Sequence, residues 1–217
     1  MKRILALVLV ALAVGSTLGA QAYTSSALFL GAAGTPSYTE TFETVPIAKD
    51  APFPFFTQAG ITYTGLAPAR SPNVWVASPG YPNFGAGLNP TTTSILTANG
   101  DEDFLITFFA PKYAVGFDAY YNGLGVATSN FFNGATLLGS VTYNGAAALG
   151  YAGFIATSGA PITSARFTST SGGLLNTGID NLVVFDSPIS SVPEPASLAL
   201  VATGLAGLGV IGRRRRL

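Results

Sequence analysis

Hydrophobic and polar residues alternate over short stretches through most of this 217-residue chain. Between Ala114 and Tyr121, the apolar side chains Val115, Phe117 and Ala119 occupy every second position. A period of two is typical of a strand with one buried face. No stretch between residues 23 and 186 keeps an apolar period of 3.6 residues for three turns. The pattern therefore predicts strands at Ser37–Phe42, Ile61–Leu66, Val74–Ala77, Ser94–Thr97, Phe104–Phe109, Ala114–Tyr121, Asn130–Asn133, Thr136–Tyr143, Gly153–Ala156, Ile162–Thr168 and Ile179–Phe185.

Glycine, proline and asparagine separate these strands. The pair Asn133-Gly134 lies between two β-rich runs and predicts a hairpin with a type I′ turn. Val45–Pro54 and Arg70–Pro90 are rich in proline. The first is expected to be a long loop and the second mostly loop around the short strand that starts at Val74, and binding surfaces often lie on such loops. Many short strands with regular turns predict an all-β fold, an antiparallel β-sandwich or jelly roll, over residues 23–186.

The N-terminal segment has the features of a secretory signal peptide. Lys2 and Arg3 precede an apolar run, Ile4–Val14, and the small-residue site Ala20-Gln21-Ala22 follows. This order predicts a signal peptide helix in residues 1–22 with cleavage after Ala22. The alternative is an uncleaved anchor, but the apolar run is shorter than the roughly 20 residues that a spanning helix needs.

The C-terminal segment is also apolar. After a short linker, residues 187–191, and two prolines, the uncharged run Ala196–Gly212 predicts a transmembrane helix of about 25 Å. Four arginines end the chain and should stay cytoplasmic by the positive-inside rule. The rest of the protein would then lie outside the inner membrane.

Residues 192–217 combine a Pro-Glu-Pro motif, an apolar helix and an arginine cluster, in that order, at the chain end. This order resembles the PEP-CTERM sorting signal. The resemblance implies recognition and removal of the tail by an exosortase, a membrane processing enzyme. The protein would be held briefly in the inner membrane and would then reach the cell surface or the exterior. A permanent single-span anchor is the alternative. The predicted sorting motif is Val192, Pro193, Glu194 and Pro195, and the predicted topology stop is Arg213, Arg214, Arg215 and Arg216.

Composition narrows the possible functions. Between Tyr23 and Val192 lie four basic and nine acidic residues, a formal charge of −5, so nucleic acid is not an expected partner. The chain has no histidine and no cysteine, which excludes Ser-His-Asp and Cys-His catalysis and imidazole or thiolate metal sites. We therefore expect a protein that is not an enzyme. A carboxylate-dependent, glycan-acting enzyme is the alternative, because two of the nine acids could still form a catalytic pair.

The part between the two ends resembles the β-sandwich domains that accompany this tail. These domains often open with Phe-Glu, as in Phe42-Glu43, and close with Ile-Asp-Asn, as in Ile179–Asn181. Some carbohydrate-binding jelly rolls hold a structural calcium ion with carboxylates near the first and last strands. The resemblance therefore implies calcium ligands at Glu43 and Asp180, completed by backbone carbonyls and waters. Otherwise Glu43 is a solvated strand end, and Asp180 with Asn181 caps a turn.

Three aromatic residues are candidates for a sugar-binding platform: Trp75, Tyr120 and Tyr121. Core packing is the alternative for each of them. Tyr120 and Tyr121 point to opposite faces of their strand, so at most one belongs to the core. The sequence as a whole predicts an exported, non-catalytic surface or matrix protein, with exopolysaccharide as the expected ligand. A purely structural building block stays open.

Overall fold

The computed structural model describes residues 20–66, 71–81, 92–99, 103–121, 125–144, 148–169 and 177–189. All of them belong to one compact unit. Residues 1–19 of the predicted signal peptide helix, the sorting motif, the transmembrane helix and the arginine cluster lie outside the described residues. Within these ranges, no helix is both long enough and apolar enough to span a membrane.

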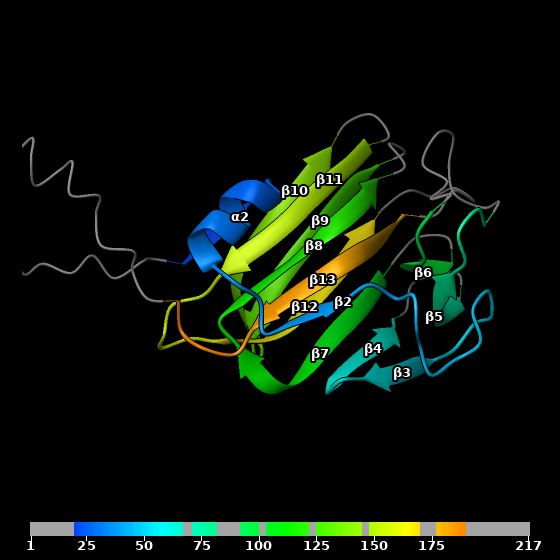
Figure 1. Ribbon diagram of the computed structural model, residues 1–217, viewed down its shortest axis with the longest axis horizontal. Helices are drawn as coiled ribbons and strands as arrows, with labels where there is room; N and C mark the ends of the chain where they lie inside the picture. Colours follow the sequence, from blue (N-terminus) through cyan, green and yellow to red (C-terminus); the bar gives the residue numbers. More distant parts are fainter. Residues whose placement is uncertain are drawn as a thin grey trace, which may run out of the picture. The chain divides into compact units, whose positions relative to one another are not determined.

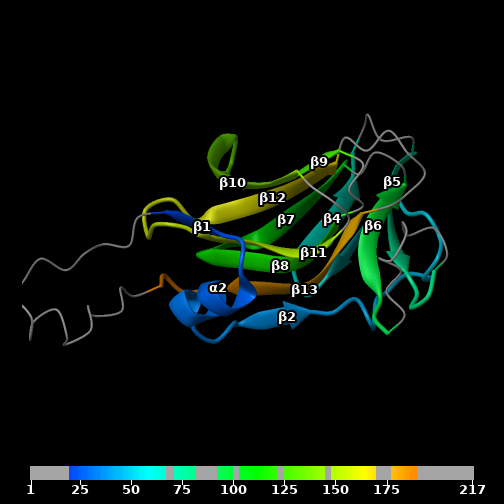
Figure 2. The same cartoon turned by 90° about the horizontal axis from the view of Figure 1, so that it is seen from above.

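The described chain folds into two antiparallel sheets, which confirms the predicted all-β sandwich. Figure 2 shows the sheets as two layers. The larger, seven-stranded sheet has the strand order β1-β11-β8-β13-β6-β5, and β2 also pairs with β13. Its strands are β1 (Gln21–Tyr23), β2 (Tyr38–Glu40), β5 (Ser71–Ala77), β6 (Ile95–Asn99), β8 (Ala114–Tyr121), β11 (Ala148–Ile155) and β13 (Gly178–Phe185).

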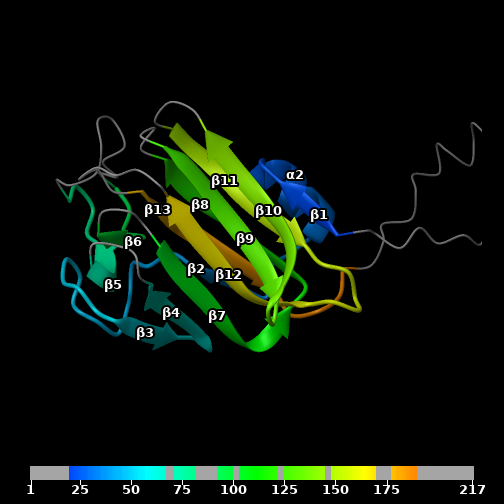
Figure 3. The same ribbon diagram turned by 180° about the vertical axis from the view of Figure 1, so that it is seen from behind.

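The second sheet has six strands in the order β10-β9-β12-β7-β4-β3 and is seen from behind in Figure 3. Its strands are β3 (Phe55–Gln58), β4 (Ile61–Gly65), β7 (Asp103–Lys112), β9 (Val126–Asn133), β10 (Thr136–Asn144) and β12 (Ile162–Ser169).

Aromatic rings fill the space between the two sheets. Phe117 of β8 lies with its ring centroid 6.3 Å from Phe131 and 6.5 Å from Phe167, which both come from the opposite sheet. Phe154 of β11 stacks on Phe131 at 5.2 Å. All of these rings are buried. The alternation read from the sequence is thus the alternation between this core and the outer face of each sheet.

Three elements were missed by the sequence analysis: β1, β3 and a helix, α2 (Ser26–Ala33). The helix has only eight residues, too few to show three turns of apolar periodicity. The Ser25 hydroxyl accepts a hydrogen bond from the Leu28 N–H and caps its start. Phe29 and Ala33, four residues apart, pack on the outer side of the seven-stranded sheet (Figures 1 and 2).

The strand β1 overlaps the predicted signal peptide. Gln21 and Ala22 pair with Ile155 and Phe154 of β11, and the Tyr23 ring meets Phe29 edge-on at 5.7 Å. The residues on both sides of the expected cleavage point therefore contribute to the edge of the sheet.

The hairpin between β9 and β10 turns one residue later than expected. Asn133 pairs with Thr136, so the two loop residues are Gly134 and Ala135. Only Gly134 has a positive φ, 56°. Glycine in the first central position is typical of a type II′ turn, so the predicted type I′ turn at Asn133-Gly134 is wrong. The predicted hairpin itself is present.

The central strand β13 has an unusual second edge. One edge pairs with β8 over most of its length, whereas the other is shared by two partners. There, β2 pairs with Leu182–Val184, and β6 pairs with Gly178 and Ile179. A bulge at Asn181, with φ 49°, separates the two pairings. We call the junction between the end of β2 and the start of β6 the seam.

The aromatic bridge between the sheets can be tested by truncation. We expect Phe117→Ala to lower the free energy of unfolding by about 3–5 kcal/mol, because it opens a cavity among rings from both sheets. The matched control is Phe109→Ala, since Phe109 is 72% exposed and its loss should cost less than about 0.5 kcal/mol. Urea titration of both variants measures the difference, and equal losses would contradict the proposed role of Phe117.

Candidate functional site

The two carboxylates predicted as calcium ligands meet at the seam. Glu43 follows β2, Asp180 lies in β13, and both accept hydrogen bonds from the pair Thr93-Ser94 that precedes β6. Glu43 Oε1 accepts from the Ser94 N–H at 2.7 Å, and Glu43 Oε2 accepts from the Ser94 hydroxyl at 3.0 Å. Asp180 Oδ2 accepts from the Thr93 hydroxyl at 2.6 Å, and Asp180 Oδ1 accepts from the Asn181 N–H at 2.6 Å. The structure therefore brings both predicted residues to one place.

A lysine also lies at the seam. Lys49 Nζ donates to the Ser94 hydroxyl at 2.6 Å and lies 3.4 Å from Glu43 Oε2. All four oxygens of Glu43 and Asp180 thus accept a hydrogen bond from the protein. Among the described residues, no group of three or more acidic side chains could hold a metal ion. Calcium at Glu43 and Asp180 stays a prediction, and the cation that the structure places beside Glu43 is the Lys49 ammonium.

The two carboxyl groups have pKa shifts in opposite directions. Hydrogen bonds from Ser94, together with the charge of Lys49, hold the pKa of Glu43 below its usual range. Burial raises the pKa of Asp180, which is 1% exposed, and the charges of Asp118 and Glu43 add to this rise. Asp180 is therefore a buried carboxylate whose environment is already negative.

The aromatic residues predicted as a platform divide between the two faces of the seven-stranded sheet. Tyr121 is 3% exposed and stacks on Tyr143 at 4.1 Å inside the sandwich, so it is a core residue. Tyr120 points the other way and packs beside Ala77 and Ile95 on the outer face. Trp75 is on this face too, because its neighbours in β5 point into the core.

Tyr120 and Trp75 lie on one row across the sheet. The row runs from Tyr120 to Gly178, then to Thr97 and Trp75, through three successive strand pairings. With strands about 4.8 Å apart, its ends are roughly 14 Å from each other. Tyr81 joins this patch at 6.2 Å from Trp75. We call Trp75, Tyr81 and Tyr120 the aromatic face.

A glycine lies in the middle of that row. A Cβ atom at Gly178 would approach the Leu96 carbonyl oxygen to 2.5 Å, so the position admits no side chain. The neighbouring Thr97 is buried. The row therefore has partly exposed rings at both ends, whereas Gly178 and Thr97 between them are buried.

Acidic groups border the aromatic face. Asp118 of β8 lies directly opposite Asp180 of β13, and its Oδ2 accepts from the Asn181 side-chain amide at 2.8 Å. Burial raises the pKa of Tyr120 to about 12, and the charges of Asp180 and Asp118 contribute to the rise. The electrostatic field at this phenol is therefore negative.

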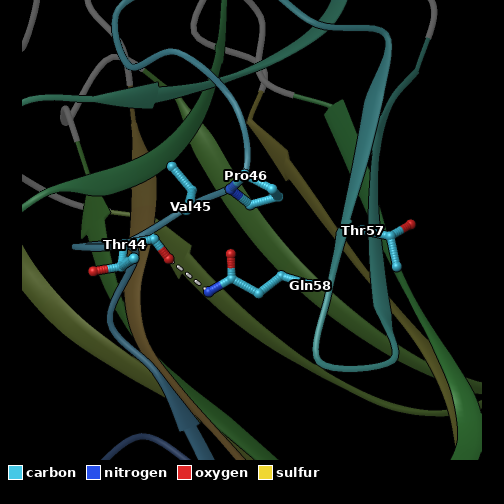
Figure 4. A pocket seen from close by; sticks show the side chains of 5 residues that line it. All are labelled: Thr44, Val45, Pro46, Thr57 and Gln58. Carbon is cyan, nitrogen blue, oxygen red and sulfur yellow. Dashed lines mark hydrogen bonds between the residues drawn. The ribbon is translucent and has the colours of Figure 1, made fainter.

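A hollow of about 390 Å³ lies on another part of the unit, between β3 and the chain that follows β2 (Figure 4). It is lined by Thr44, Val45, Pro46, Thr57 and Gln58. Gln58 Nε2 donates to the Thr44 carbonyl at 2.7 Å and ties the two segments together. The described residues of this lining carry no charged side chain, so they can hold a ligand through hydrogen bonds and apolar contact.

Several exposed residues of the six-stranded sheet were not selected from the sequence. Phe55 and Phe109 are 60% and 72% exposed, and Arg166 forms a two-pronged ion pair with Asp103 at 2.7 and 2.6 Å. Local alternation shows that Phe109 faces away from Phe108, but it does not tell which face of the strand is covered.

The comparison with protein families decides the nature of the tail. Residues 191–216 match the family described as the PEP-CTERM protein-sorting motif. The chain carries a PEP-CTERM sorting motif. The predicted resemblance is confirmed, and the predicted Pro-Glu-Pro and arginine residues fall inside the matched stretch. The PEP-CTERM motif marks an exported protein that is sorted at the membrane and implies recognition by an exosortase.

Among curated proteins, no sequence matches the chain. The K2 cleaved adhesin domain of Lys-gingipain aligns over 69% of this chain and 98% of its own, at 12% identity and a TM-score of 0.49. A xylan-binding domain of CBM 22 aligns over 73% and 98%, at 13% identity and a TM-score of 0.42.

Burial and the nearby negative charges raise the pKa of Tyr120, and this shift predicts how the stability of the fold depends on pH. Its folded pKa of about 12 exceeds the ordinary value of 10.0, so the fold favours the neutral phenol. The contribution of Tyr120 to stability is complete below pH 10.0 and is lost as the pH rises through about 12. The difference in tyrosinate absorbance between the wild type and Tyr120→Phe measures this titration. Asp118→Asn should lower the pKa by removing a nearby negative charge, and an unchanged midpoint would contradict the proximity of Asp118.

Proposed function

We propose that this chain is an exported, non-catalytic protein of the cell surface or extracellular matrix that binds exopolysaccharide through its aromatic face. Residues 23–186 would form the binding domain, and residues 192–217 would deliver it and then be removed by an exosortase-type enzyme. The observation that carries the binding proposal is the shared row of Tyr120 and Trp75, with a glycine between them.

The geometry of the row suits a short length of a sugar chain. Rings at its two ends offer flat apolar surfaces for sugar rings, while the Tyr120 hydroxyl and the nearby Asp118 can bond sugar hydroxyls. Both rings are held by packing against the sheet, which limits the entropy lost when a ligand binds.

The charge of the face favours an uncharged polysaccharide. Asp118 and Asp180 lie beside Tyr120, and the described part of the chain has few cations to offset them. A uronate-rich polymer would bring more negative charge into this field and would be repelled.

Binding can be measured by affinity electrophoresis of the full-length chain in gels containing xylan as a neutral probe or alginate as an acidic one. We expect the neutral polymer to retard the wild type and alginate to have less effect. Trp75→Ala and Tyr120→Ala should each weaken binding roughly 10-fold, because truncation of an aromatic anchor at a binding interface commonly costs more than about 1 kcal/mol.

Phe109→Ala is the matched control, since it removes an exposed ring of the other sheet and should leave binding unchanged. Equal retardation of Tyr120→Ala and the wild type would overturn the proposed site. Release of reducing ends from the polymer, lost in Asp118→Asn, would instead favour the carboxylate-dependent enzyme. Assembly of the chain without retardation by any envelope polysaccharide would favour a structural building block.

The sorting proposal has a separate test. Mass spectrometry of the protein from its native host should find the mature form without Arg213–Arg216, because cleavage before or within the apolar run removes them. A Glu194→Gln variant tests whether the exosortase needs the carboxylate of the motif. An intact tail in the mature extracellular fraction would contradict processing and would leave the permanent anchor.

A further inference from the structure

The seam joins parts of the chain that are distant in sequence. Ser94 lies 51 residues from Glu43 and 45 residues from Lys49, and Thr93 lies 87 residues from Asp180. The backbone supplies no continuous ladder here, because β2 has ended and β6 has only begun. Side-chain hydrogen bonds therefore close the second edge of β13 at this point.

Three carboxylates lie at the seam: Glu40, the buried last residue of β2, the buried Asp180, and Glu43, whose side chain is 45% exposed. A carboxylate removed from water is costly unless it is paired or fully hydrogen-bonded. Asp180 has two neutral donors and no cation at hydrogen-bond distance among the described residues. Glu43 raises the pKa of Asp180, so the two negative charges act on each other. A cation near Glu43 reduces this repulsion.

The side chain of Lys49 supplies this cation. Its ammonium lies 2.6 Å from the Ser94 hydroxyl, which in turn donates to Glu43 Oε2 at 3.0 Å. The hydroxyl thus accepts from the cation and donates to the anion, and its orientation is fixed. Lys49 is only 26% exposed at its side chain, so water screens the pair incompletely.

The neighbouring residue holds Lys49 in position. The Asp50 N–H donates to the Val76 carbonyl at 2.9 Å, and Asp50 Oδ1 accepts from the Ser78 N–H at 2.7 Å. These bonds attach the loop after β2 to β5 at the point where Lys49 turns toward Ser94. The fold therefore holds the Lys49 ammonium at the seam.

We propose that the Lys49 ammonium is the cation of the seam, in the position that the resemblance assigns to calcium, and that the fold needs no divalent metal there. A calcium ion bound to Glu43 would have to displace the ammonium, since two cations next to the same carboxylate repel each other. Each oxygen of Glu43 and Asp180 already accepts a hydrogen bond, which leaves fewer lone pairs for a metal ion.

Thermal unfolding of the full-length chain with calcium chloride and with chelator tests this proposal. We expect the wild type to have the same Tm in both. Lys49→Met keeps the length of the side chain but removes its charge, so in chelator its Tm should fall by several degrees. Calcium should restore part of that loss, because Glu43 and Asp180 then lack a cation. Lys49→Arg should stay close to the wild type.

Lys112→Met is the control for calcium response. Lys112 pairs with Asp186 away from the seam, so its loss should not make the Tm depend on calcium. A wild type stabilised by calcium, or one that releases heat on calcium titration, would overturn the proposal without any variant. A Lys49→Met protein as stable as the wild type, or one that calcium does not stabilise, would overturn it as well.

Discussion

The pairing of β13 on both edges is the constraint on which the rest of this domain depends. One edge is bonded to β8, and the other is divided between β2 and β6. A divided edge leaves a gap in the ladder, and buried backbone and carboxylate groups in a gap need partners. Glu43, Lys49 and the Thr93-Ser94 pair supply them. The bulge at Asn181 lies between the part of β13 that pairs with β6 and the part that pairs with β2.

The two ends of the outer face of the seven-stranded sheet are covered differently. Helix α2 covers one end and buries Phe29 against β8 and β11. The other end keeps the aromatic face, where Tyr120 and Tyr81 pack on Ala77 and Ile95. Asp180 of the seam and the neighbouring Asp118 lie beside this face, and their charges contribute to the raised pKa of Tyr120. The proposed ligand preference would therefore share Asp180 with the seam.

Much of the fold could be predicted from the sequence, because strand alternation is a local property of side chains. The strand Ala114–Tyr121 has the bounds that were expected, and Tyr120 and Tyr121 divide between the two faces as a period of two requires. Short elements were missed: α2 is too brief to show a period, and β3 follows a proline-rich loop. The turn at Gly134 differs because loop length is set by the pairing of both strands.

The sequence by itself determined the destination of the protein, since the PEP-CTERM tail is a contiguous motif that is read in order along the chain. It also pointed to Glu43, Asp180, Trp75 and Tyr120. Only the tertiary structure decided what surrounds them. Hydrogen bonds across 51 and 87 residues are not written in any local pattern. The fold placed an ammonium beside Glu43 and a glycine between two rings, because non-local strand pairing decides which side chains become neighbours.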